Sequence, residues 1–387
     1  MNSWLPGEDL HMFDRRLIKD FDWLTLLLAV LLSGFGVLGI FSATRGESGL
    51  SQVFIDHLVR LGLGAAVLLV IITVDYRHII RYAYLIFFAT ILLLLAVEFY
   101  GRVGMGAQRW LSFGGIRLQP SEFIKIAMVL MLARYFGSLK KKPPLTLKDV
   151  LPTLAATGLA FVLILRQPDL GTALVVAGIY IVMLFVAGLS IRLYLWTGAA
   201  LLASTGVFIA LAWFRVFNVL SLLRDYQVRR LKVLFNPELD PLGAGYHIAQ
   251  SKIAIGSGGL TGKGFLQGTQ SGLNFLPQQH TDFIFSVLAE EGGFVVSVAV
   301  LALMLALLMW GINTARKAQD RSGYFIALGV VTLLFLHFTV NIGMTTGILP
   351  VVGLPLPLLS YGGSSVLTTF AGLGLVMNVR MRRYVFS

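Results

Sequence analysis

The acidic residue Asp282 stands where a polar segment meets a long apolar run, in the stretch PQQHTDFIFSVLAEEGG (277–293). A carboxylate at such a boundary is costly to keep charged, because apolar surroundings favour its neutral form. A carboxylate with a tuned pKa within reach of a hydroxyl group can remove its proton as a general base. The alternative is structural, with Thr281 or Asp282 capping the next helix. Spacing alone leaves both interpretations open.

Two further carboxylates, Glu290 and Glu291, follow Asp282 in the same apolar run. Helical geometry places Glu290 about 12 Å along the axis from Asp282. That distance is too long for a direct acid–base pair. We therefore expect a structural or substrate-positioning role for Glu290.

A second candidate site is the stretch GAQRWLSFGGIRLQPSEFIK (106–125). The guanidinium of Arg109 could hold a phosphate through two parallel hydrogen bonds, and Trp110 would suit a sugar face. An interfacial Trp–Arg anchor at the membrane surface explains the same two residues. Pro120 followed by Ser121 and Glu122 is typical of a helix start, and Glu122 is a candidate supporting residue.

Lys125 falls one turn inside an apolar run, where a lone ammonium is expensive and needs a partner. The stretch RQPDLGTALV (166–175) offers one, because Pro168 ends a span and Asp169 opens the next helix. We predict an intramembrane Lys125–Asp169 ion pair, which either has a purely structural role or lines a polar cavity.

Two Gly-rich segments also need an interpretation. GLPLPLLSYGGSS (353–365) can offer backbone N–H groups and hydroxyls, Ser360 among them, or can be a plain turn between helices. GSGGLTGKG (256–264) is similar to a phosphate-binding loop, but it lacks the G-x-x-x-x-G-K-[ST] spacing. Nucleotide binding at this second segment is therefore rejected.

Composition identifies the elements that must position these residues. The chain has 387 residues, 57% of them hydrophobic and 13% charged, whereas a soluble domain carries roughly 25% charged residues. Apolar blocks of roughly 17–25 residues can each cross about 30 Å of hydrocarbon as a helix. We predict about ten membrane-spanning helices, at 23–43, 57–74, 79–99, 121–136, 150–165, 170–188, 193–214, 283–310, 323–347 and 360–379.

The distribution of Lys and Arg predicts that both termini are cytoplasmic, because these residues concentrate in alternate inter-helix segments. The expected fold is thus an all-α polytopic membrane protein with a single domain over 1–387 and a cytoplasmic tail over 1–22. The large loop 216–281, between helices 7 and 8, is expected outside, as are Arg109, Trp110, Asp169 and Asp282. Within this loop, the amphipathic stretch 246–260 predicts a helix in contact with the membrane surface.

The remaining composition excludes several classes of function. The net charge of +12 is spread over short inter-helix segments, which argues against a nucleic-acid partner. The chain has no cysteine, and its histidines lack metal-ligand spacing. No carboxylate cluster of the two-metal kind is present, so a divalent cation is left open as the one candidate cofactor. A surplus of basic residues in the large loop suits phosphate-bearing membrane lipids.

The motifs GAQRWL, QPSE, RQPDLGTALV, HTDFIFSVLAEE and GLPLPLLSYGGSS together resemble the SEDS family of bacterial cell-wall proteins, over essentially the whole chain. Within that family the chain is more similar to the elongation members than to the division members. The resemblance implies a peptidoglycan glycosyltransferase that polymerises lipid II outside the bacterial cytoplasmic membrane, with a class B penicillin-binding protein as partner. It places the family's essential aspartate at Asp282, its loop tryptophan at Trp110 and its buried Lys/Asp pair at Lys125 and Asp169.

Two other functions fit a groove for a lipid-linked sugar. A lipid II flippase should carry ionisable groups through the whole membrane depth and towards both faces, whereas here they gather at the predicted external ends. A non-catalytic scaffold for a penicillin-binding protein would not need a carboxylate at position 282. On this basis we expect an inverting glycosyltransferase with Asp282 as its base.

Overall fold

The computed structural model describes residues 20–44, 51–104, 107–113, 116–141, 143–192, 195, 240, 243–273, 275–276 and 278–383. Its elements are, in chain order, α2 (Trp23–Thr44), α3 (Gln52–Thr73), α4 (Tyr76–Arg81), α5 (Ala83–Tyr100), β1 (Arg102–Gly104), β2 (Ala107–Phe113), β3 (Ile116–Leu118), α6 (Pro120–Ser138), α7 (Leu147–Arg166), α8 (Leu170–Ala187), α11 (Ala244–Ser257), α12 (Thr269–Gly272), α13 (Ile284–Arg316), α14 (Arg321–Thr345) and α15 (Gly363–Met381).

The predicted membrane spans that fall on described residues each coincide with a long helix. The span predicted at 193–214 lies almost wholly outside the described residues. Among the helices that the structure describes, seven are long and apolar enough to cross a membrane: α2, α3, α5, α7, α8, α13 and α14. The chain is therefore built as a multi-pass membrane protein.

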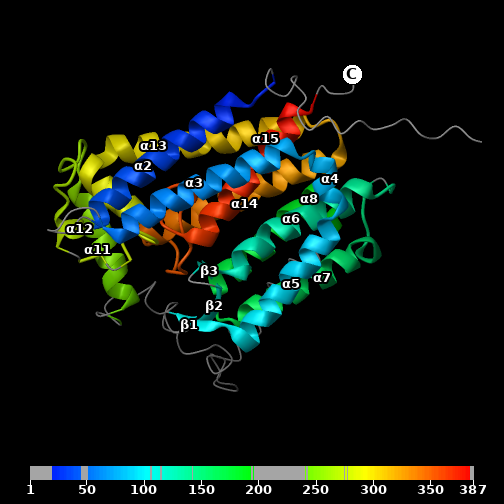
Figure 1. Ribbon diagram of the computed structural model, residues 1–387, viewed down its shortest axis with the longest axis horizontal. Coiled ribbons are helices and arrows are strands. Elements are labelled where there is room, and N and C mark those ends of the chain that lie inside the picture. Colours follow the sequence, from blue (N-terminus) through cyan, green and yellow to red (C-terminus); the bar gives the residue numbers. More distant parts are fainter. Residues whose placement is uncertain are drawn as a thin grey trace, which may run out of the picture.

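Two helices of 19 residues, α6 and α15, are less apolar than those seven. Both are enclosed by other helices: α6 packs against α5, α7, α8 and α14, and α15 packs against α3, α6, α13 and α14 (Figure 1). Most residues of α6 and α15 are buried. Helices enclosed by other helices can carry polar side chains that lipid would not accept.

The structure corrects the all-α prediction at 102–118, where β1, β2 and β3 form an antiparallel sheet in that order. Alternation explains it: Leu111 of β2 is buried and Ser112 is half-exposed, which is the period-two pattern of a half-buried strand. Figure 1 places this sheet, α11 and α12 at one end of the helices, and α4 with the end of α15 at the other.

The end of the bundle away from the sheet is fastened by buried basic side chains. The guanidinium of Arg380 lies 3.8 Å from the ring centroid of Trp310 and 3.6 Å from the carboxylate of Asp22. The indole nitrogen of Trp310 donates to the same carboxylate at 2.9 Å. These contacts tie α2, α13 and α15 together at the end that the sequence predicts to be cytoplasmic.

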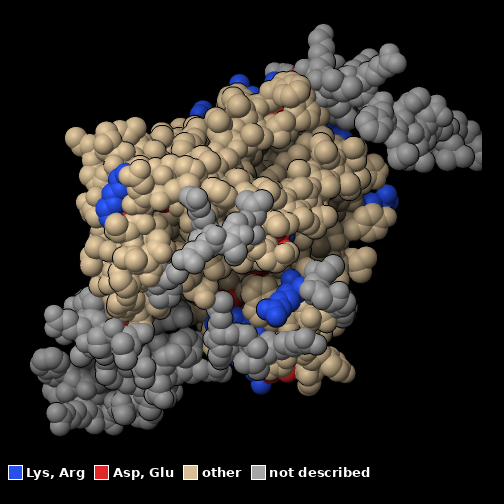
Figure 2. All heavy atoms as spheres, turned by 60° about the vertical axis from the view of Figure 1, so that its left-hand side comes forward, with Lys and Arg blue, Asp and Glu red and all other residues tan. Residues whose placement is uncertain are grey.

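The surface is consistent with a lipid-facing exterior. In Figure 2, the described residues of the visible face are mostly uncharged, and Lys and Arg lie chiefly towards its margins. Large apolar side chains such as Leu85, Phe88 and Phe185 are more than half exposed. Such exposure is unfavourable in water but suits a hydrocarbon solvent.

Candidate active site

Asp282 lies at the junction between a turn and α13, as the sequence predicts, and its side chain is half-buried. Helix α13 begins at Ile284, with Phe283 in the N-cap position. The alternative in which Thr281 or Asp282 occupies the N-cap is therefore wrong.

The chain segment that carries Asp282 is held by the turn at 353–361. The hydroxyl of Ser360 donates to the carbonyl of Thr281 at 2.5 Å and accepts from the backbone N–H of Leu356 at 2.8 Å. The N–H of Tyr361 donates to the carbonyl of His280 at 2.9 Å. Ser360 therefore supports the site through the backbone, and this Pro/Gly turn has a clear structural role.

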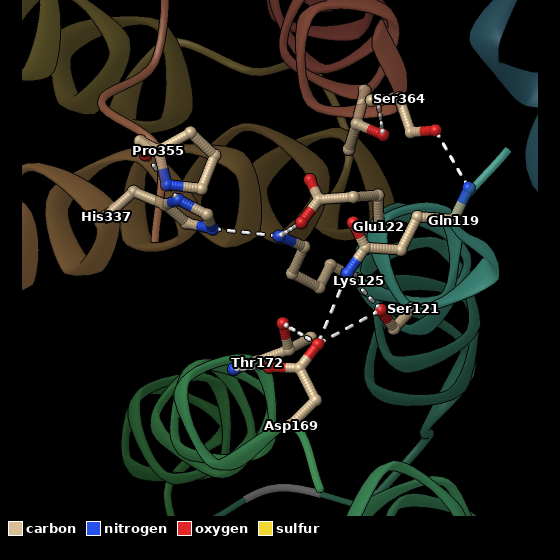
Figure 3. A network of polar contacts seen from close by, with 10 residues as sticks. Gln119, Ser121, Glu122, Lys125, Asp169, Thr172, His337, Pro355 and Ser364 are labelled. Carbon is tan, nitrogen blue, oxygen red and sulfur yellow. Dashed lines mark hydrogen bonds and ion pairs between the residues drawn. The ribbon is translucent and has the colours of Figure 1, made fainter. Parts of the chain in front are cut away.

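Lys125 and Glu122 form a buried ion pair on α6. Their Nζ and Oε1 atoms lie 2.7 Å apart, and both side chains are at most 5% exposed. Lys125 Nζ also lies 2.9 Å from the Nε2 of His337 on α14, as Figure 3 shows. The ammonium, which could not be buried alone, thus has a carboxylate and a ring nitrogen as partners.

The predicted direct Lys125–Asp169 pair is wrong. Asp169 instead accepts from the N–H of Thr172 at 3.2 Å and its hydroxyl at 3.0 Å, from the Gln119 amide at 3.2 Å and from the Ser121 hydroxyl at 3.4 Å. Asp169 is the N-cap of α8, where the positive end of the helix favours a carboxylate. The physical reason for the error is that each charged group already has nearer partners on its own helix, at i+3 or i−3.

Gln119 connects this cluster to the last helix, because its backbone N–H donates to the Ser364 hydroxyl of α15 at 2.9 Å. Gln119, Ser121, Glu122, Lys125 and Asp169 thus lie together at the starts of α6 and α8 (Figure 3). The fold gathers buried polar groups at the end of the bundle that carries the sheet.

Arg109 lies on β2 and points towards the turn between α7 and α8. Its Nε donates to the carbonyl of Gln167 at 3.0 Å, and one of its Nη groups donates to the carbonyl of Pro168. Arg109 therefore fixes the turn that precedes Asp169, and two of its donors are engaged before any phosphate binds. Trp110 is half-buried and, as the next residue of the strand, faces the opposite side of the sheet.

Glu290 is fully buried and anchors the large loop to α13. Its Oε1 accepts from Lys263 Nζ at 2.6 Å and from the backbone N–H groups of Thr269 at 2.8 Å and Gln270 at 3.0 Å. The neighbouring Glu291 accepts from the Ser42 hydroxyl of α2. These contacts support a structural role for Glu290.

The Gly-rich segment 256–264 fills a break in α13, a role that the sequence did not reveal. Gly293 has φ +65° and interrupts the helix. The N–H groups of Lys263 and Gly264 donate to the carbonyls of Glu290 and Glu291, both at 3.0 Å, and the N–H of Phe294 donates to the carbonyl of Gly259 at 2.9 Å. The loop thereby supplies the partners that the broken helix lacks.

Gly262→Ala should destabilise the fold by about 2–4 kcal/mol. Gly262 has φ +81°, and a Cβ there would lie 2.0 Å from the carbonyl oxygen of Glu291. The matched control is Gly256→Ala in α11, where a Cβ meets nothing within 4 Å and helix propensity favours alanine. Thermal unfolding in detergent compares them, and equal melting temperatures would refute the close fit of this loop.

The amphipathic stretch predicted at 246–260 is helical, as α11. Its buried residues Ile248, Ser251 and Ala254 recur every three positions, as one face of a helix requires. The hydroxyls of Ser251 and Ser286 lie 2.7 Å apart, and that of Ser251 donates to the carbonyl of Thr345 at 2.6 Å. This face packs on α13 and α14, while contact of α11 with the membrane surface stays a prediction.

Two polar residues of α14, His337 and Asn341, belong to this region but were not predicted as site residues. Both are buried, at 2% and 0% exposure. The available signal was their spacing, because two polar side chains at i and i+4 in an apolar run share one helix face. Among the described residues, no group of three His, Asp or Glu side chains is placed to hold a metal ion.

Comparison with known proteins now gives the family. The FtsW/RodA/SpoVE family model, described as a cell cycle protein, matches residues 22–385. The chain belongs to this family. It is 45% identical over 372 residues to the peptidoglycan glycosyltransferase MrdB of Escherichia coli, covering 94% of each chain. It is 37% identical to the peptidoglycan glycosyltransferase RodA of Treponema pallidum, covering 95% of this chain and 99% of that one.

Solved structures agree with this family and with the fold. One chain from a peptidoglycan synthase complex, described as coordinating polymerization and crosslinking, superposes with a TM-score of 0.79 at 32% identity, over 94% of this chain and 98% of that chain. The crystal structure of the rod shape determining protein RodA of Thermus thermophilus gives a TM-score of 0.68 at 30% identity over the same shares of the two chains.

Proposed function

We propose that this chain is a peptidoglycan glycosyltransferase that polymerises lipid II at the outer face of the bacterial cytoplasmic membrane during cell elongation. The names of its relatives and the likeness to a synthase complex support this activity. The end of the bundle with the sheet, α11 and Asp282 is the one that we assign to the outside, because the basic residues of the other end favour the cytoplasm.

The assignment of Asp282 as the base rests on how its environment differs from that of the other carboxylates predicted at this end of the bundle. Glu122, Asp169 and Glu290 are each at most 4% exposed, so a substrate could not reach their carboxylates. Asp282 is half-buried on a segment whose backbone is held from several sides. A base must be fixed and yet reachable by substrate, and Asp282 fits that requirement best.

In the proposed reaction, the Asp282 carboxylate takes the proton of the 4-hydroxyl of the acceptor's N-acetylglucosamine. That oxygen attacks C1 of the donor's N-acetylmuramic acid, and the bond from C1 to the polyprenyl pyrophosphate breaks with inversion. The pyrophosphate leaves as an anion, which preorganised positive charge would stabilise. Because two donors of Arg109 bind carbonyls, we assign most of that charge to basic residues of the loop 216–281 that lie outside the described residues.

The class B penicillin-binding protein is the proposed partner, which would cross-link the strands that this chain makes. This assignment is supported by the similarity of the chain to one chain of a solved peptidoglycan synthase complex, which is described as coordinating polymerization and crosslinking. A flippase is the second candidate, because buried ionisable groups lie at both ends of the bundle, Lys125 and Asp169 at the sheet end and Asp22 and Arg380 at the other.

The test is a polymerisation assay with purified chain, labelled lipid II and the partner protein, for wild type and Asp282→Asn. Glycan strands from wild type and none from the variant support a glycosyltransferase with Asp282 as base. Transport of labelled lipid II across vesicles without strand formation would favour the flippase. Equal strand formation by both proteins would remove Asp282 from the mechanism, and none with either protein would favour the scaffold.

A further inference from the structure

Helix α14 carries two buried polar side chains, His337 and Asn341, that point at the turn bordering Asp282. The amide Nδ2 of Asn341 donates to the carbonyl of Asp282 at 3.0 Å and to that of Leu354 at 2.7 Å. Both neighbours are carbonyl oxygens, which only accept, so the NH₂ side of the amide must face them. One side chain thus joins the Asp282 segment to the turn at 353–356.

That turn lies beside the carboxyl group itself. Gly353 has φ +71°, and a Cβ built on it would lie 3.4 Å from Asp282 Oδ2. The residue after Gly353 is Leu354, whose carbonyl Asn341 binds. Asn341 therefore sets the distance between the backbone of Asp282 and the backbone that borders its carboxylate.

His337 precedes Asn341 by four residues on α14 and makes a second contact with the turn at 353–356. Lys125 can only donate, so its contact with the ring at 2.9 Å makes Nε2 the acceptor. The other nitrogen, Nδ1, then carries the proton and donates to the carbonyl of Pro355 at 3.2 Å. Adjacent carbonyls, of Leu354 and Pro355, are thus held by side chains at i+4 and i of a single rigid helix.

Packing alone does not explain an amide at position 341, because a buried amide without all its hydrogen bonds lowers the stability of the fold. Its Oδ1 atom is buried and accepts no hydrogen bond among the described residues, and an unsatisfied buried acceptor destabilises a fold. What the amide contributes is two donors aimed at two carbonyls. This points to placement of the segment rather than to stability.

We propose that Asn341 is a positioning residue for the carboxylate of Asp282, acting through the backbone without touching substrate. The inference rests on the proposed function, in which Asp282 is the base. A misplacement of about 1 Å at a reacting group can lower the rate on the order of 100-fold. Loss of Asn341 should therefore lower kcat and leave KM nearly unchanged.

The test is Asn341→Asp, which keeps the shape of the side chain and replaces its donors by an oxygen. A carboxylate would repel both carbonyls, so polymerisation per folded molecule should fall on the order of 100-fold, with KM within about threefold. A protonated carboxyl can donate one hydrogen bond, so the activity of the variant relative to wild type should rise as the pH falls. Asn341→Ser, with one shorter donor, provides a second variant if Asn341→Asp does not fold.

Asn378 of α15 gives a matched control at the other end of the bundle. It is also fully buried, and its Nδ2 also donates to two carbonyls, of Ile71 and Val74, both at 2.5 Å. Its Oδ1 accepts from Arg382 at 2.5 Å and from the N–H of Tyr76 at 3.2 Å. Asn378→Asp also sets an oxygen against two carbonyls, so it should lower thermal stability, with wild-type kcat in the folded fraction.

Asp282→Asn measured in parallel separates the two hypotheses. An inactive Asp282→Asn together with a wild-type kcat for Asn341→Asp overturns the positioning role and leaves the proposed function standing. A rise in KM alone, or equal losses of kcat in Asn341→Asp and Asn378→Asp, also overturns it. An active Asp282→Asn overturns both proposals.

Discussion

Asp282→Asn should reduce glycan polymerisation by about 10²–10⁴-fold, the usual contribution of a general base. The amide has nearly the shape of the carboxylate but cannot take a proton at neutral pH. The backbone contacts of this position, from Asn341 to its carbonyl and from its own N–H to the carbonyl of Gln278, do not involve the side chain and should persist. Folding and binding to the partner should therefore be retained.

A labelled lipid II assay with reconstituted protein and partner measures this effect, with a pull-down as the check on partner binding. The control is Asp56→Asn near the sheet end of α3, whose carboxylate accepts a single exposed hydrogen bond from Gln52 at 2.8 Å. It removes a charge by the same chemical change and should polymerise at close to the wild-type rate. If Asp282→Asn keeps more than about a tenth of the wild-type rate, the base must be another group.

The positions of the helices could be predicted from the sequence, because a bilayer imposes one length on each apolar run. Hydropathy finds α2 and α8 with nearly correct ends. It misses the sheet at β1 to β3 altogether, because the seven residues of β2 carry a weaker signal than about twenty apolar residues in a row. The break at Gly293 could not be predicted, since it depends on a loop some thirty residues earlier in the chain that supplies its hydrogen bonds.

The site was predictable where chemistry is local and not where it depends on helix packing. Asp282 and Lys125 attract attention because each is an ionisable group beside apolar residues. The partner of Lys125 was misassigned because its external position suggested Asp169, while Glu122 lies only three residues away and on the same helix face. Asn341 was missed because its role appears only when α14, α13 and the turn at 353–356 are brought together.

Breaking the buried pair on α6 should cause a large loss of stability. Lys125→Met removes the ammonium that lies 2.7 Å from Glu122, a residue that is only 4% exposed. Removing one partner of a buried pair typically costs about 3–5 kcal/mol. The melting temperature in detergent should fall sharply. By contrast, Lys141→Met breaks a pair with Asp149 in which the lysine side chain is 45% exposed, and it should leave the melting temperature nearly unchanged.

The double variant Glu122→Gln with Lys125→Met tests whether the loss comes from an uncompensated charge. Without a buried charge, the protein should recover much of the stability that Lys125→Met loses, giving a coupling that a double-mutant cycle can measure. Additive losses would mean that the pair is not the source of the effect. If stability recovers and polymerisation does not, Lys125 has a role in activity besides its role in stability. The reason would be that His337 still lacks the donor on its Nε2, which fixes the ring against the carbonyl of Pro355. The turn at 353–356, which borders Asp282, would then be less well held.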